Sequence, residues 1–221
     1  MPGYVFQFRL VFQEFPSLLE GALLTIHLSF LTLLLSLIVG TAGAMCRLSR
    51  IAWLRRPATW YVEVVRNTPL LVQLFFIYFG LPGIGVRLSN ETASVLAMVI
   101  NLGAYAAEIV RAGIATTPRG QIEAAQSLAL SELQVFTRVV LPPSLQRVWP
   151  ALVSQIIIVM LGSAVCGQIS TNELSYAVNL IHSRNFRAFE ATFVGTGIYL
   201  VMAIALRHLL NWAGPRFVFG K

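Results

Sequence analysis

The stretch ALLTIHLSFLTLLLSLIVGTAGAM, residues 22–45, decides the fold of this chain. It holds no Asp, Glu, Lys or Arg, and it exceeds the roughly 20 apolar residues that a helix needs to cross a bilayer. More apolar runs follow, so this run is a membrane span and not a cleaved signal peptide. Of the 221 residues, 57% are hydrophobic and only 11% are charged. We therefore predict an all-α integral membrane protein.

Four further apolar runs give about five predicted transmembrane helices. The expected spans are Leu18–Cys46, Trp60–Pro82, Thr92–Thr116, Trp149–Ser170 and Glu190–Trp212. They form one membrane domain over residues 1–221, in which residues 118–148 are the longest polar connection. Arg47–Ala58 is expected to be a second connection, and Asn172–Phe189 a loop with room for a short helix. Pro69 lies inside the second span, so we expect a kink or an unwound turn there.

The basic residues are unevenly distributed between the two sides that these spans define. One side receives twelve Lys and Arg residues, and the other receives four: Arg9, Arg87, Arg184 and Arg187. Because basic loops stay in the cytoplasm, we expect the N-terminus outside and the C-terminus in the cytoplasm. The same bias accounts for the net charge of +7, and we expect no nucleic-acid partner.

The acidic residues and the cysteines exclude several kinds of function. All nine acidic residues are Glu, and the only Lys is Lys221, so the chain has neither a Walker-A loop nor a Walker-B Asp. The two cysteines form no CxxC pair, and no metal site is indicated. Any ATP hydrolysis must therefore come from another chain, and we expect this chain to be no enzyme and to hold no cofactor. An intramembrane protease is disfavoured, because Ser163 has no base on a nearby rigid element.

The long polar connection has the pattern of a helix over Gly120–Leu141. Pro142 and Pro143 are expected to end it, since proline lacks the N–H donor. The small residues Ala124 and Ala129 would allow the backbone of a partner to approach closely. From the pattern alone, a surface helix without a partner is an equal alternative. The residues expected on one face of this helix are Ile122, Ala125, Ala129, Leu133 and Phe136.

Three motifs, in order along the chain, resemble those of bacterial ABC importer permeases. The family's EAA loop reads E-A-A, three residues, G, nine residues and I-x-L-P, and here Ala129 replaces the Gly and Val139 the Ile. Residues 63–73 (EVVRNTPLLVQ) and 104–114 (AYAAEIVRAGI) resemble spans of the branch that imports histidine, glutamine and glutamate or aspartate. The loop residues carried over from the resemblance are Gly120, Glu123, Ala124, Ala125, Ala129, Leu141 and Pro142.

The resemblance implies a type I (MetI-like) importer permease in the bacterial inner membrane. Such a subunit pairs with a second permease chain, and two ATPase subunits, which bind ATP and Mg²⁺, dock on the EAA loop. An external solute-binding protein delivers the polar amino acid. The alternative from another class is a stand-alone channel or secondary carrier for small polar solutes, which would explain buried amides but not the EAA loop.

Four charged residues inside the spans are expected to meet. Glu63 and Arg66 lie three apart in the second span, and Glu108 and Arg111 lie three apart in the third. Both pairs fall toward the cytoplasmic ends of antiparallel helices, and charges in a membrane are costly unless they are paired. We expect an ion-pair cluster that is either a cytoplasmic gate or a static structural network.

The substrate path is less well defined by the sequence. Its candidate residues are Gln73, Asn101, Ser163 and Gln168. Family members commonly read L-K-D-[ST]-S-L in the fourth span, where this chain reads LGSAVC at residues 161–166. Without that Lys and Asp, the chain is expected to contribute little charge to a substrate site. The loss favours a heterodimer, in which the partner supplies those charges, over a homodimer.

Overall fold

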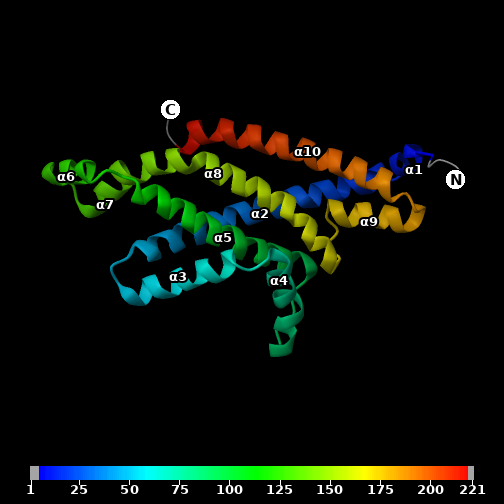
Figure 1. The fold of residues 1–221 in the computed structure, drawn as a ribbon, viewed down its shortest axis with the longest axis horizontal. Helices are drawn as coiled ribbons and strands as arrows, with labels where there is room; N and C mark the ends of the chain where they lie inside the picture. Colours follow the sequence, from blue (N-terminus) through cyan, green and yellow to red (C-terminus); the bar gives the residue numbers. More distant parts are fainter. Residues whose placement is uncertain (1–4, 219–221) are drawn as a thin grey trace. The chain divides into compact units, whose positions relative to one another are not determined.

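The computed structural model describes residues 5–218, which contain helices, turns and loops and no strand (Figure 1). The α-helices are α1 (Phe8–Gln13), α2 (Phe15–Leu48), α3 (Ala52–Arg66), α4 (Leu70–Phe75), α5 (Asn90–Ala115), α6 (Arg119–Ser127), α7 (Glu132–Gln134), α8 (Leu141–Gly162), α9 (Leu174–Asn185) and α10 (Ala188–Ala213). The π-helical turns are η1 (Phe76–Gly80), η3 (Val135–Val140) and η5 (Gly214–Val218), and the 3₁₀ helices are η2 (Leu81–Ile84) and η4 (Ser163–Ile169). The predicted all-α fold is confirmed.

The long apolar helices agree with the predicted number of spans. Four are long and apolar enough to cross a membrane, and a fifth span results if one broken helix pair is counted together. The predicted short helix in the loop Asn172–Phe189 is α9. The four are Phe15–Leu48, Asn90–Ala115, Glu132–Ile169 and Ala188–Arg216, and the broken pair is Ala52–Arg66 with Leu70–Ile84.

The second span breaks where the sequence predicts a kink. Helix α3 ends at Arg66, and Pro69 precedes the first residue of α4. The Asn67 side-chain amide donates to the Glu63 carbonyl (2.7 Å), and the Thr68 hydroxyl donates to the Val64 carbonyl (3.0 Å). The Thr68 bond satisfies a carbonyl that the interrupted helix leaves without a backbone partner, as an apolar surrounding requires. The Glu63 carbonyl also accepts the Asn67 backbone N–H (3.2 Å), so the Asn67 side chain reinforces the end of α3.

The start of the second span was predicted wrongly. Helix α3 begins at Ala52 rather than at Trp60, so most of the expected connection Arg47–Ala58 is helical. Pro57 lies inside this helix, where it removes the hydrogen bond to the Trp53 carbonyl. Because Trp53 is exposed, water can hydrate that carbonyl and the helix continues.

The described residues form two compact units. Helices α2, α5, α8 and α10 each contribute residues to both, so the units are not successive domains along the chain. Unit 1 contains residues 5–33, 69–98 and 158–205, and unit 2 contains residues 34–68, 99–157 and 206–218.

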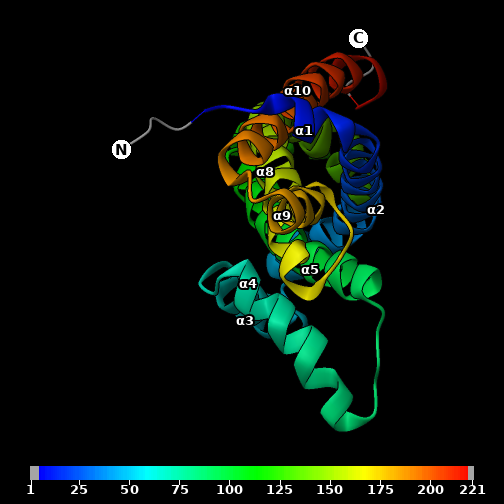
Figure 2. The same cartoon turned by 90° about the vertical axis from the view of Figure 1, so that its right-hand side faces the viewer.

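The core of unit 1 gathers around α9. Val11 of α1, Leu18 of α2, Ile181 of α9 and Ala191 of α10 share one buried apolar cluster. Figure 2 shows the ribbon of α9 viewed along its axis. Where α2 meets α9, a Cβ atom added to Gly21 would lie 2.9 Å from the Cα atom of a neighbouring residue. Only glycine permits this close approach of the two backbones.

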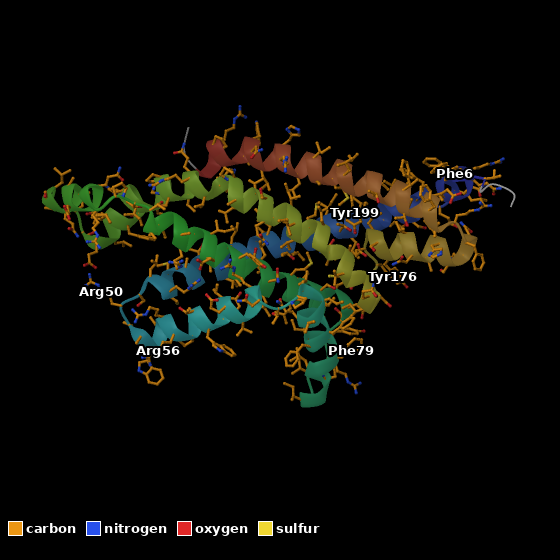
Figure 3. The ribbon with its side chains drawn as sticks, viewed as in Figure 1. Phe6, Arg50, Arg56, Phe79, Tyr176 and Tyr199 are labelled. Carbon is orange, nitrogen blue, oxygen red and sulfur yellow. The ribbon has the colours of Figure 1, made fainter. Side chains whose placement is uncertain are left out.

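A buried carboxylate fixes the start of α9. The Glu173 side chain is fully buried and accepts from the backbone N–H groups of Ser175 and Tyr176, both at 2.8 Å. It also accepts from the Tyr199 hydroxyl of α10 at 2.6 Å, and Figure 3 labels Tyr176 and Tyr199. Burial raises the pKa of the Glu173 carboxyl, whereas these three donors act to lower it. The carboxylate therefore caps α9 and links it to α10.

In unit 2, α5 packs against both α2 and α3. A Cβ atom on Gly40 would lie 2.6 Å from the Cβ atom of Ala106, so α2 and α5 touch through their smallest residues. On its other side, α5 accepts a hydrogen bond from the Tyr61 hydroxyl of α3 at the Ile100 carbonyl (2.6 Å). Small residues that bring backbones together are the usual contact between membrane helices.

Replacing Gly40 by Ala tests this contact. The added methyl group has no room beside Ala106, so we expect the free energy of unfolding to fall by about 1–3 kcal/mol. The matched control is Gly197→Ala in α10, where the new Cβ atom meets nothing within 4 Å. Chemical denaturation in mild detergent measures both variants. Equal stabilities of the two would contradict the packing that we describe.

Candidate functional site

The polar segment 118–148 begins with helix α6. Ala125 is buried on its inner side, where it packs with Val135 and Val140. The opposite side exposes Gly120, Glu123 and Ala124. The Glu123 carboxylate makes no ion pair or hydrogen bond within residues 5–218, so α6 presents a short, small-residue face with one free negative charge.

Helix α6 ends in a left-handed residue that the sequence pattern did not reveal. Ala129 has φ 58°, and the predicted single helix over Gly120–Leu141 is therefore wrong. The Leu130 N–H donates to the Ala125 carbonyl (3.4 Å), and the Ala129 N–H donates to the Gln126 carbonyl (2.9 Å). This bonding is the Schellman end of a helix, which places glycine at the left-handed residue. The conformation explains why the EAA pattern has Gly at this position.

The predicted helix stop at the two prolines is also wrong. A capping box of Ser131 and Gln134 starts a new helix, which continues through η3 into α8. Pro142 and Pro143 stand in the first turn of α8. The backbone N–H groups that they lack would have donated to carbonyls of the preceding π-helical turn η3. A wide turn of this kind leaves room for the missing bonds.

The break at Ala129 also divides the predicted apolar face. Ile122 and Phe136 pack against the buried cluster around Ala125. Leu133 instead points outward and is 70% exposed, and Leu128 is 77% exposed. Two large apolar side chains of this segment are thus uncovered, and one of them, Leu128, directly follows α6.

Both ends of segment 118–148 are fastened to each other. The hydroxyl groups of Thr117, after α5, and Ser144, in α8, lie 3.1 Å apart and are buried. The Arg147 guanidinium donates to the carbonyl (3.1 Å) and the hydroxyl (2.8 Å) of Thr116. Polar contacts between two helices hold the segment as a closed loop on a stiff base.

The four charged residues predicted to cluster do so, and a fifth residue, Arg47, joins them. Glu108 accepts two hydrogen bonds from Arg111, at 2.6 and 3.2 Å, and one from Arg47 of α2. Arg47 also lies 3.9 Å from the Glu63 carboxylate, and Arg66 lies 4.0 Å from Glu108. The Arg47 side chain is only 9% exposed. Glu108 is therefore the carboxylate on which three arginines converge.

Sequence reasoning missed the part played by Arg47. It was counted among the basic residues of a cytoplasmic connection, because it follows directly on the first apolar run. Its position in the last turn of α2 was the available signal. The two interpretations of this cluster, a cytoplasmic gate and a static structural network, stay predictions.

The substrate-path candidates are divided between the two units. Asn101 belongs to unit 2 and is buried, whereas Gln73, Ser163 and Gln168 belong to unit 1. In unit 1, α4, which carries Gln73, packs against η4, which carries the exposed Gln168. Ser163 is fully buried, and its hydroxyl donates to the Met160 carbonyl (2.7 Å), so it lines no open path in this structure.

A family model described as "Binding-protein-dependent transport system inner membrane component" matches residues 32–218. The chain belongs to this family. The resemblance stated from the three motifs is thereby confirmed, and the permease is a membrane subunit of the ABC-importer type.

Individual relatives agree with the family. A Bacillus subtilis (strain 168) protein named "Probable amino-acid ABC transporter permease protein YckA" is 34% identical over 210 residues, covering 95% of this chain and 88% of that protein. The "Crystal structure of an amino acid ABC transporter with histidines" contains a chain that is 34% identical, with a TM-score of 0.88 over 97% of this permease and 100% of that chain. The inward-facing MetNI methionine transporter shares the fold at 21% identity, with a TM-score of 0.70 over 91% and 94% of the chains.

The left-handed residue of the permease gives a prediction with an opposite-sign control. Ala129→Gly should raise the free energy of unfolding by about 0.5–1 kcal/mol, because it relieves the strain of a left-handed alanine. Ala124→Gly, inside α6, should lower it by about 0.5–1 kcal/mol. Thermal unfolding in detergent, with hydrogen exchange of the α6 amides, measures both. If both Ala129→Gly and Ala124→Gly lowered the free energy of unfolding, the left-handed Schellman end at Ala129 would be contradicted.

The convergence on Glu108 gives a second prediction. Glu108→Gln keeps the size of the side chain but leaves Arg47 buried without its carboxylate, and we expect a loss of about 3 kcal/mol in unfolding free energy. The control Glu63→Gln removes an exposed carboxylate, 59% accessible, and should cost less than about 1 kcal/mol. Chemical denaturation compares the two. Equal losses would place the centre of the network elsewhere.

Proposed function

We propose that this permease forms the path of a polar amino acid across the bacterial inner membrane, and that segment 118–148 couples it to ATP hydrolysis by separate ATPase subunits. The observation that carries the proposal is the exposed face of Gly120, Glu123 and Ala124 on α6, with Leu128 uncovered beside it. Small residues next to a large apolar one form a shallow surface onto which a partner can pack closely.

Coupling needs a joint that does not yield. Two rigid bodies move together only if the element between them is stiff, and α6 is held from within by Ala125 and its cluster. The bonds of Thr117 to Ser144 and of Arg147 to Thr116 hold both ends of the segment. These contacts support a role as a docking helix rather than a free surface loop.

The proposed partners follow from the proposed role as an importer permease. Two ATPase subunits would bind ATP and Mg²⁺, and this chain would hold no cofactor itself. A second permease chain would complete the path, with a heterodimer favoured over a homodimer, and an external solute-binding protein would deliver the substrate. The amino-acid class is supported by the Bacillus relative's name and by the histidines in the solved transporter.

The substrate path would use uncharged polar groups rather than charges. Gln73, Asn101, Ser163 and Gln168 remain the proposed polar residues, of which Ser163 is buried in this chain. An uncharged path in this chain agrees with the missing Lys and Asp of the fourth span. A stand-alone channel is the alternative, but it assigns no role to the exposed face of α6.

Co-purification of the ATPase tests the proposal. We expect Ala124→Trp to reduce the ATPase that co-purifies with the tagged permease about tenfold, which corresponds to a clash of about 1.4 kcal/mol. The variant should fold normally, since Ala124 is exposed. Transport complexes extracted from bacterial membranes in mild detergent provide the sample, and the bound ATPase is quantified by mass spectrometry.

The matched control is Ala151→Trp, the same substitution at an exposed position of α8 outside the segment. It should retain the ATPase. Retention by both variants would move the contact to another surface, and absence of the ATPase from the unmodified complex would favour the channel alternative.

A further inference from the structure

Helix α3 has an apolar face that nothing in unit 2 covers. Its buried side, with Val62 and Val65, packs on α5. The opposite side bears an apolar stripe at i, i+4, i+7 and i+11, which is one face of a helix. Trp53 is 89% exposed and Trp60 is 72% exposed. The members of this stripe are Trp53, Pro57, Trp60 and Val64.

Positive charge surrounds the N-terminal end of the stripe. Arg50, Arg55 and Arg56 are exposed, and none of their guanidinium groups makes a hydrogen bond or ion pair within residues 5–218. Figure 3 labels Arg50 and Arg56 at the same end of α3. The first carboxylate of the helix is Glu63, which already faces Arg47 at 3.9 Å. This end of α3 is therefore a local positive charge without a counter-ion.

The connection to α2 indicates what surrounds this face. Only residues 49–51 separate the end of α2, a helix apolar enough to span the membrane, from the start of α3. The N-terminal end of α3 thus follows the span directly, at the boundary that Trp residues prefer. By the distribution of basic residues, this boundary is the inner one, where anionic lipids attract arginine.

We propose that the N-terminal end of α3 is a binding surface for anionic phospholipid. Arg50 and Arg56 contact the lipid phosphate, and the indole rings of Trp53 and Trp60 lie between the headgroups and the acyl chains. At 100° per residue, Arg56 stands beside the stripe, whereas Arg55 projects from another side of the helix and adds only general attraction. A zwitterionic lipid carries its own compensating ammonium group, so the surface selects lipids with net negative charge.

A protein partner fits this face less well. A protein partner would have to supply carboxylates to three arginines, because α3 itself has no acidic residue before Glu63. Two indoles at a membrane boundary with unpaired arginines beside them match the chemistry of a lipid interface. The inference depends on the membrane placement of α2 and α3 and not on the proposed transport function.

Quenching by brominated lipids tests the proposal. The full chain, with Trp60, Trp149 and Trp212 replaced by Phe, keeps Trp53 as its single fluorophore. It is reconstituted into vesicles of phosphatidylcholine and phosphatidylglycerol in which one lipid or the other carries bromine. We expect brominated phosphatidylglycerol to quench Trp53 at least about twofold more than its share of the bilayer predicts, given the attraction of each arginine for an anionic surface.

The variant Arg50→Gln/Arg56→Gln should bring the quenching by the two lipids to parity. Its control is Arg119→Gln/Arg138→Gln, which removes the same charge from exposed positions of segment 118–148 and should keep the preference. High salt should weaken the preference in the parent. Circular dichroism and size-exclusion chromatography establish that each variant is folded.

Two results would overturn the proposal. Equal quenching of the parent by both lipids would mean that Trp53 meets lipid without selecting its headgroup. Quenching by neither lipid would mean that Trp53 does not meet lipid, because it stands in water or because a second copy of the chain covers it. Either outcome leaves the co-purification result for Ala124→Trp unaffected, so the two proposals fail separately.

Discussion

A backbone in hydrocarbon has no water to accept or donate its hydrogen bonds, and this constraint shapes every element of the permease. It requires helices throughout the apolar runs, and it requires that each interruption be satisfied from nearby. Thr68 bonds a carbonyl that α3 leaves open, and in the connection after the fourth span the Glu173 carboxylate bonds the N–H groups at the start of α9. The interruptions in the spans are thus built from polar side chains at fixed places.

The polar groups that serve this constraint also hold the helices together. In unit 2, Glu108 binds arginines from α2 and α5, and Thr117 and Ser144 join α5 to α8. In unit 1, Glu173 joins α9 to α10 through Tyr199. Between these contacts the helices touch through glycine and alanine. Apolar burial alone would distinguish poorly between neighbouring helices and lipid, so polar contacts and close backbone packing set the arrangement.

The sequence predicted the parts of the structure that depend on composition. Uncharged runs predicted the spans. The spacing of four charged residues predicted that they form a cluster: Glu63, Arg66, Glu108 and Arg111. Features that depend on the neighbours of a residue were missed. The exposed environment of Trp53 lets Pro57 stay inside α3, and the π-helical turn η3 lets α8 begin with two prolines.

The strained position in segment 118–148 was missed for a similar reason. Ala129 reads as a good helix former, and only its backbone conformation shows that it ends α6. The Gly that the family pattern has at this position indicated a left-handed residue, but the Ala in this chain does not show it. Arg47 was misjudged because its role lies in contacts with α3 and α5 that are distant in the chain.

The absence of a loop between η3 and α8 has a mechanical consequence. Residues 132–157 of unit 2 lie in one continuous helical run, so the second half of segment 118–148 is the end of a long helix. A displacement of this end passes along the helix instead of being absorbed by a slack connection. The turn around Ala129 separates α6 from this helix, so the stiffness of that turn sets how much of a displacement of α6 the helix receives.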